Sequence, residues 1–132
     1  MYAITDTHSL IWYLNADPRL SKKARTAFDE SLNNSNPIGL PTICIIEIIY
    51  LPEKNKIPPE AYTSLLSALE IPDSLFTLVP LDKQIAINLK NISRDQVPDM
   101  PDRIIAATAY SYNIPVISKD GKIKTSTVKT IW

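Results

Sequence analysis

The sequence has few of the residues on which thiol or imidazole chemistry depends. Its one cysteine, Cys44, excludes an internal disulfide framework and a cysteine-rich zinc site. Because Cys44 stands in an apolar run, we interpret it as a small core residue and not as a nucleophile. His8 is the only histidine, and we interpret it as a packed or hydrogen-bonding side chain and not as a catalyst. This cysteine usage permits a reducing compartment, and we expect a cytoplasmic protein.

The chain also lacks net charge and long apolar segments. Fourteen basic residues balance fourteen acidic ones, which neither favours nor excludes a nucleic-acid partner, because bound metal ions can supply positive charge at a phosphodiester site. The first residues show no signal-peptide pattern, and no apolar run has the length of a bilayer-spanning helix. The 132 residues, 45% of them hydrophobic, suit one domain over residues 1–132 with a core of its own.

Short apolar runs alternate with segments of helical spacing along the whole chain. The runs predict strands at residues 2–5, 38–40, 76–79, 116–118 and 127–132, the last at an edge. The intervening segments predict helices at residues 10–14, 22–32, 59–69 and 103–110, one after Pro41 and one after Asp82. The alternation indicates an α/β fold: a mostly parallel central sheet with helices on both faces.

Local signals refine these helices. Ser21, Thr42, Asp82 and Asp99 are expected as N-caps, Asn113 as a left-handed stop, and residues 52–59 as a proline-rich loop. Helical spacing predicts three buried faces, formed by Ala24, Ala27, Phe28 and Leu32, by Ile43, Ile46 and Tyr50, and by Tyr62, Leu65, Leu66 and Leu69.

Four acidic residues are placed where a parallel sheet binds ligands. Asp6 and Asp120 follow predicted strands, and Asp102 lies in the first turn of the helix that leads to the strand at 116–118. Glu47 lies among isoleucines, where a carboxylate is costly unless it is paired or binds a metal. Four acids at one sheet edge would repel each other without a cation, and their hard oxygen donors suit Mg²⁺ or Mn²⁺.

Each acid taken alone has a simpler interpretation. Asp6 can be an ordinary N-cap, and Asp99 is well placed as an N-cap with Asp102 as its capping partner. Asp120 before Gly121 is a turn signal, and Glu47 can lie on a solvent-facing edge of its helix. The combination on alternating elements is what favours a site.

The motifs that carry these acids resemble those of PIN domains, especially the toxin nucleases of VapC type. Residues 6–12, Asp-Thr-His-Ser-Leu-Ile-Trp, resemble the family's opening motif, and residues 45–48 around Glu47 resemble its second acidic position. Residues 99–109 are similar to the segment in which an Asp, here Asp102, heads an Ile-Ala-Ala helix. Residues 116–120 resemble the strand that delivers the fourth acid, and the four motifs follow the family's order.

The resemblance implies Mg²⁺- or Mn²⁺-dependent cleavage of RNA by a toxin that forms a homodimer and is inhibited by a small antitoxin. Asp6, Glu47, Asp102 and Asp120 would be the catalytic metal ligands, supported by Thr7, Ser118 and Asp99. Arg103, Lys119 and Lys122 are candidates for contact with the RNA backbone, although they can also be ordinary surface charges.

Two features depart from the family pattern, and neither removes an acid. Pro52 closely follows the Glu47 helix, where many relatives continue with a longer helix, and Lys119 stands beside Asp120. Two other functions remain open at this point. One is a receiver or aspartyl-phosphotransfer domain, which leaves Glu47 and the helix headed by Asp102 unexplained; the other is a non-catalytic RNA- or protein-binding module on the same fold.

Overall fold

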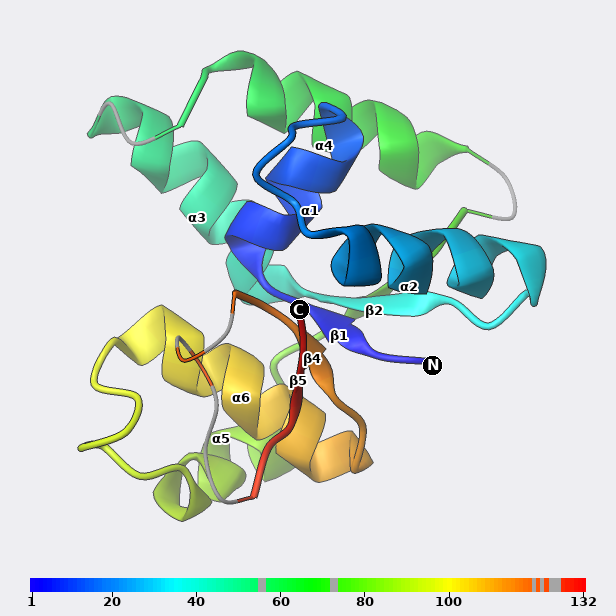
Figure 1. The fold of residues 1–132 in the computed structure, drawn as a ribbon. Coiled ribbons are helices and arrows are strands. Elements are labelled where there is room, and N and C mark those ends of the chain that lie inside the picture. Colours follow the sequence, from blue (N-terminus) through cyan, green and yellow to red (C-terminus); the bar gives the residue numbers. More distant parts are fainter. Residues whose placement is uncertain (55–56, 72–73, 120, 122, 124–126) are drawn as a thin grey trace.

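The computed structural model describes residues 1–54, 57–71, 74–119, 121, 123 and 127–132 (Figure 1). Its strands are β1 (Ile4–Thr5), β2 (Ile38–Pro41), β3 (Phe76–Val79), β4 (Val116–Ile117) and β5 (Thr130–Ile131). Its helices are α1 (Thr7–Leu14), α2 (Lys22–Asn33), α3 (Thr42–Glu53), α4 (Glu60–Glu70), α5 (Lys83–Asn88), the 3₁₀ turn η1 (Leu89–Asn91) and α6 (Met100–Tyr112). In this described part, no helix combines the length and the hydrophobicity needed to cross a bilayer.

The strands form one sheet in the order β3-β2-β1-β4-β5, and every described pair is parallel. The chain moves outward from β1 to β2 and β3 and then returns to place β4 on the other side of β1. With right-handed crossovers, this reversal puts α1 to α4 on one face and α5 and α6 on the other, as Figure 1 shows. The predicted parallel α/β fold is confirmed, and the crevice between the ends of β1 and β4 is its topological switch point.

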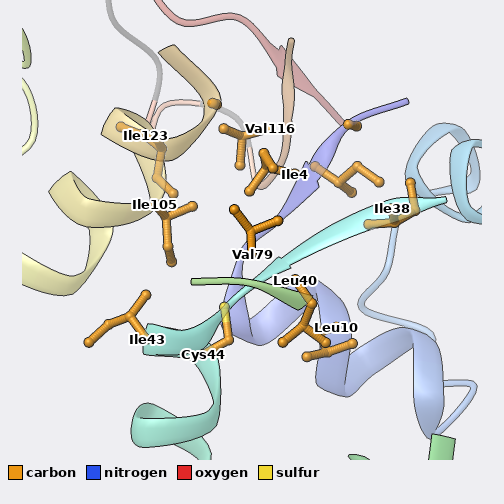
Figure 2. Close-up of a cluster of buried hydrophobic side chains, with 14 of the residues drawn as sticks. Ile4, Leu10, Ile38, Leu40, Ile43, Cys44, Val79, Ile105, Val116 and Ile123 are labelled. Carbon is orange, nitrogen blue, oxygen red and sulfur yellow. The ribbon is translucent and has the colours of Figure 1, made fainter. Parts of the chain in front are cut away.

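The core fills both sides of this sheet. Leu10 of α1, Leu40 of β2 and Ile105 of α6 are completely buried, and Figure 2 shows them in one cluster with other strand residues. Gly39 lies where β2 passes β1, and a Cβ atom there would come within 2.5 Å of the Ile4 Cδ1 atom and 3.2 Å of a Val79 methyl. A side chain at residue 39 is therefore excluded by packing and not by backbone conformation.

Most helix ends follow their predicted caps. The side chains of Ser21, Asp82 and Asp99 accept hydrogen bonds from the first turns of α2, α5 and α6, and Asn113 ends α6 with a φ of 53°. The prediction for Thr42 is wrong, because β2 runs directly into α3 and Pro41 occupies the cap position. The Thr42 hydroxyl instead accepts a hydrogen bond from the backbone N–H of Leu81.

Some predicted boundaries are also wrong. Helix α3 includes Pro52 and ends at Glu53, so the expected loop from residue 52 begins later. A proline in the last turn removes only one backbone hydrogen bond, which a helix packed along its length tolerates. Helix α1 begins at Thr7, earlier than expected, because Asp6 caps it.

The predicted apolar faces are only partly correct. Ile43, Phe28 and Leu65 are buried, but Ile46 is 58% exposed, Tyr50 51% and Leu32 53%. Tyr62 and Leu66 of α4 are each 38% exposed. Where isoleucine or leucine occurs all around a helix, spacing does not determine which side packs, so the tertiary contacts decide it.

Candidate active site

Asp6 is held at the carboxyl end of β1 and is only 1% exposed. Its Oδ1 atom accepts a hydrogen bond of 2.8 Å from the backbone N–H of Ser9, which makes Asp6 the N-cap of α1. Its Oδ2 atom accepts a second bond of 2.5 Å from the hydroxyl of Ser118, which directly follows β4. One carboxyl oxygen of Asp6 therefore caps α1, and the other accepts a hydrogen bond from a residue at the end of the neighbouring strand β4. Both donors are uncharged groups.

Glu47 is half-buried on α3, beside the first turn of α1. The hydroxyl of Thr7, a residue 2% exposed, donates a hydrogen bond of 2.6 Å to its Oε1 atom. Such short bonds to ionised carboxylates are stronger than bonds between neutral groups. Because Thr7 directly follows Asp6 in the sequence, the start of α1 fixes the carboxylates of both Asp6 and Glu47.

Cys44 lies in the first turn of α3, three residues before Glu47. It is completely buried, and its Sγ atom lies 3.8 Å from the Thr5 carbonyl oxygen. Burial raises the pKa of the Cys44 thiol well above its ordinary value, and the negative charges of Asp6, Glu47 and Asp102 raise it further, while the nearby Thr7 hydroxyl acts in the opposite direction. The thiol is therefore neutral, as expected of a core residue.

Asp102 lies half-buried in the first turn of α6, where a helix N-terminus favours negative charge. The preceding Asp99 is exposed, and its Oδ2 atom accepts a 3.2 Å hydrogen bond from the backbone N–H of Asp102. The two acids of this segment thus have different surroundings. Asp99 caps the helix, while Asp102 lies half-buried in its first turn.

The three predicted basic contacts differ in their placement. Arg103 donates from one guanidinium nitrogen to the carbonyl oxygens of Leu89 and Ile92, both at 3.2 Å, so it anchors the η1 segment against α6. Lys119 is exposed directly after Ser118. Asp120 and Lys122 lie outside the described residues, so the fourth predicted acid has no described position.

The donor chemistry of the site suits a hard divalent cation. Asp6, Glu47 and Asp102 offer carboxylate oxygens at one end of the sheet, as Mg²⁺ and Mn²⁺ prefer. Within the described residues, no three His, Cys, Asp or Glu side chains are positioned to hold a metal ion by themselves. Asp120, which follows β4, is the remaining acid of the predicted set.

Comparison with known families identifies the architecture around this acidic edge. The PIN domain profile matches residues 3–126, nearly the whole chain. The chain belongs to the PIN domain family. This assignment confirms the resemblance found in the sequence motifs, and it contradicts the receiver-domain alternative.

Solved structures share the fold of this PIN domain. A chain in the crystal structure of VapBC2 from Rickettsia felis, bound to a DNA fragment from their promoter, is similar with a TM-score of 0.73 at 15% identity, over 98% of this chain and 97% of that chain. A chain in the crystal structure of FitAcB from Neisseria gonorrhoeae is similar with a TM-score of 0.63 at 22% identity, over 98% and 96% of the two chains. A comparison with curated protein sequences gives no match.

Beside Asp6, this PIN domain has a hollow that the sequence did not indicate. It measures about 230 Å³ and is lined by Asp6, His8, Ser9, Trp12 and Lys119. The rings of His8 and Trp12 lie 5.8 Å apart, which confirms that His8 is a packed residue. Their spacing of four residues on one helix face was a signal that could have predicted this contact.

Proposed function

We propose that this PIN domain is a metal-dependent endoribonuclease that hydrolyses RNA phosphodiester bonds and acts as the toxin of a toxin–antitoxin pair. The observation that carries the proposal is the buried carboxylate of Asp6 at the switch point, bonded to the Ser9 N–H and the Ser118 hydroxyl, with the carboxylate of Glu47 bonded to the adjacent Thr7. Carboxylates concentrated at one sheet edge destabilise the folded state, because they repel each other and are partly removed from water. Metal binding is a function that gives them a role.

The cofactor we propose is Mg²⁺ or Mn²⁺, held by Asp6, Asp102 and Asp120, with Glu47 binding directly or through water. When bound, such an ion supplies an activated water molecule and neutralises charge on the phosphate. The donor set contains no histidine or thiolate, which favours a hard cation over zinc.

The chain's own residues hold the carboxylates in fixed orientations. Ser118 and the Ser9 N–H bind the two oxygens of Asp6, and Thr7 binds one oxygen of Glu47. Hydrogen bonds of this kind orient metal ligands and tune their basicity. They also reduce the cost of burying the Asp6 carboxyl group.

The proposed partners are an RNA substrate, a small antitoxin and a second copy of the chain, in the cytoplasm. The similarity in fold to VapBC2 and FitAcB supports the toxin assignment. An apolar face on α3 and α4 supports a protein partner, because large exposed apolar patches mark interaction sites. We use the name α3–α4 face for the exposed apolar residues of the two helices, Ile46, Ile49, Tyr50, Tyr62 and Leu66. Ile49 and Tyr62 line a hollow of about 320 Å³ between the helices.

The test is cleavage of a panel of structured RNAs by the protein with Mg²⁺, with Mn²⁺ and with a chelator, beside the Asp6→Asn variant. We expect cleavage that requires the metal and is lost in Asp6→Asn, since asparagine keeps the cap but removes the charge. Thermal melting gives an independent readout. An ion at a hundred times its Kd stabilises the folded state by about 2.7 kcal/mol.

Two results would count against this proposal. The first is a melting temperature that neither ion changes at millimolar concentration. The second is cleavage that persists in Asp6→Asn, which would indicate a contaminating nuclease or another site. Binding of RNA without any cleavage would instead support the alternative of a non-catalytic module.

A further inference from the structure

Residues 131 and 132 contact both of the elements between which Asp6 is held. The carbonyl oxygen of Ile131 in β5 accepts a 3.3 Å hydrogen bond from the backbone N–H of Ser118, which directly follows β4. The ring of Trp132 lies 5.8 Å from the ring of Trp12 on α1. One short segment at the edge of the sheet is therefore joined both to the residue whose hydroxyl binds Asp6 and to the helix that Asp6 caps.

The hydroxyl of Ser118 reaches Asp6 from a backbone that two neighbouring strands hold. On one side, the N–H of Asp6 donates a 3.1 Å hydrogen bond to the carbonyl oxygen of Ile117. On the other side, the bond from Ser118 to Ile131 extends the pairing of β4 with β5 by one residue. Because Ser118 is completely buried and its bond to Asp6 is 2.5 Å long, a shift of this backbone would weaken the bond.

Strand β5 is held to the sheet by few backbone contacts. It has two residues, both half-buried, and it pairs with β4 at the edge of the sheet. Short edge elements of this kind open locally at a low cost in free energy. Side-chain packing is therefore needed to keep β5 in place, and the contact between Trp132 and Trp12 supplies it.

Trp12 is a firm support for this contact. The guanidinium of Arg19 lies 5.1 Å from the centre of its ring, and Arg19 is itself held by a 2.7 Å ion pair with Asp17. The backbone N–H of Asp17 donates a 2.8 Å hydrogen bond to the carbonyl oxygen of Trp12. His8 packs against the same ring. The ring that Trp132 contacts therefore has a defined place relative to the first turn of α1.

We propose that Trp132 is a positioning residue for Asp6. By packing against Trp12, it keeps β5 beside β4, and β5 in turn fixes the backbone of Ser118, from which the hydroxyl orients the carboxylate. Metal ligands bind more tightly when hydrogen bonds hold them in the orientation that the ion requires. This inference rests on the proposed metal-dependent function and adds to it a residue outside the acidic set that sets the affinity for the ion.

The first experiment is hydrogen exchange of individual amides, measured by NMR with a chelator present. Trp132→Ala should speed the exchange of the Ser118 amide by roughly threefold to tenfold, because loss of the aromatic contact lets β5 open more often. Trp132→Phe should retain most of the protection, since phenylalanine can still pack on Trp12. The Gly39 amide, which is bonded to Ala3 in the interior of the sheet, should change less and is the internal control.

The second experiment is a titration of Mn²⁺ into the wild type, Trp132→Ala, Ser118→Ala and the double variant. Trp132→Ala should weaken the affinity by roughly threefold to tenfold, as residues do that act from outside a site. It should cause no further loss in the Ser118→Ala background, because both substitutions remove the same restraint on Asp6. Tyr13→Ala is a matched control. It also removes a ring from α1, one that stacks on Phe28 at 4.3 Å, and it should lower stability without changing the affinity for Mn²⁺.

Each result tests a different step of the inference. Equal acceleration of exchange at Ser118 and Gly39 would show that Trp132 only stabilises the fold, and it would overturn the proposal. An unchanged affinity for Mn²⁺ in Trp132→Ala, or additive losses of binding free energy in the double variant with Ser118→Ala, would also overturn it. A wild-type protein that binds neither Mg²⁺ nor Mn²⁺ would instead overturn the proposed function, and the role of Trp132 with it.

Discussion

The hydroxyl of Ser118 lies 2.5 Å from the Oδ2 atom of Asp6 and joins residues that are 112 positions apart in the sequence. Both residues are buried, Asp6 at the end of β1 and Ser118 at the end of β4. The bond links the ends of β1 and β4 and sets the orientation of the most deeply buried acid among the described residues. It makes Ser118 the natural residue with which to test whether orientation of Asp6 matters for function.

Ser118→Ala should weaken the affinity for Mn²⁺ and reduce RNA cleavage by roughly 10- to 100-fold, because it removes a donor that holds a metal ligand. Titration of Mn²⁺ and kcat/KM measure the two effects. Ser111→Ala is a control, because the Ser111 hydroxyl also donates a hydrogen bond, in its case to the backbone carbonyl oxygen of Ala107, and lies near the other end of α6 from Asp102. If both variants lose activity equally, the loss reports stability and not the Ser118 contact.

Two substitutions of Thr7 separate the effect of its hydroxyl from the effect of its shape. Thr7→Val keeps the shape but removes the hydroxyl that binds Glu47, whereas Thr7→Ser keeps the hydroxyl. We expect a loss of cleavage of roughly tenfold or more in Thr7→Val and near-normal activity in Thr7→Ser. Equal activities of the two variants would show that the bond to Glu47 has no role in the reaction.

The acids of the α6 segment should respond differently to the same substitution. Asp102→Asn should abolish cleavage with little change in melting temperature. Asp99→Asn should retain most activity, since asparagine is also a good N-cap and Asp99 is exposed. Cleavage assays and thermal melting of both variants give the answer. An inactive Asp99→Asn beside an active Asp102→Asn would reverse the assignment.

Gly39 should be intolerant of even one methyl group. Gly39→Ala is expected to lower the free energy of unfolding by about 1–3 kcal/mol, as for other overpacked cores. Ile4→Val removes the Cδ1 atom that lies 2.5 Å from the new Cβ position. In a double-mutant cycle by urea unfolding, Ile4→Val should therefore cost less in the Gly39→Ala background than alone. If the losses in free energy of unfolding are additive, the clash between the methyl group introduced at residue 39 and Ile4 does not occur in the variant.

The α3–α4 face should be an interface. We expect a homodimer by light scattering, a growth defect when the protein is expressed alone, and relief of that defect by a small co-expressed neighbour. Ile46→Glu and Tyr50→Glu place charges on exposed positions, so they should impair association without unfolding the chain. A strict monomer would contradict the dimer, and normal growth during strong expression of active protein would contradict the toxin role.

Local patterns in the sequence determined the α/β class, the helix caps and the choice of acids. Ser21, Asp82 and Asp99 cap the helices they were expected to cap, because a cap depends on residues only three apart. The alternation of apolar runs with helical segments was enough to predict a parallel sheet. The motifs around Asp6, Glu47 and Asp102 were enough to indicate a PIN domain, which the family match confirms.

The tertiary structure decided what depends on contacts between distant residues. Helix α3 is apolar on all sides, so its sequence did not predict which side packs against the core. The structure leaves Ile46 and Tyr50 exposed. Asp6 looked like either an N-cap or a site residue, and it is the N-cap of a helix while also bonded to Ser118, because a carboxylate has two oxygens and the fold supplies a donor to each. Sequence spacing encodes local hydrogen bonds, whereas the second bond exists only after β4 has been laid beside β1.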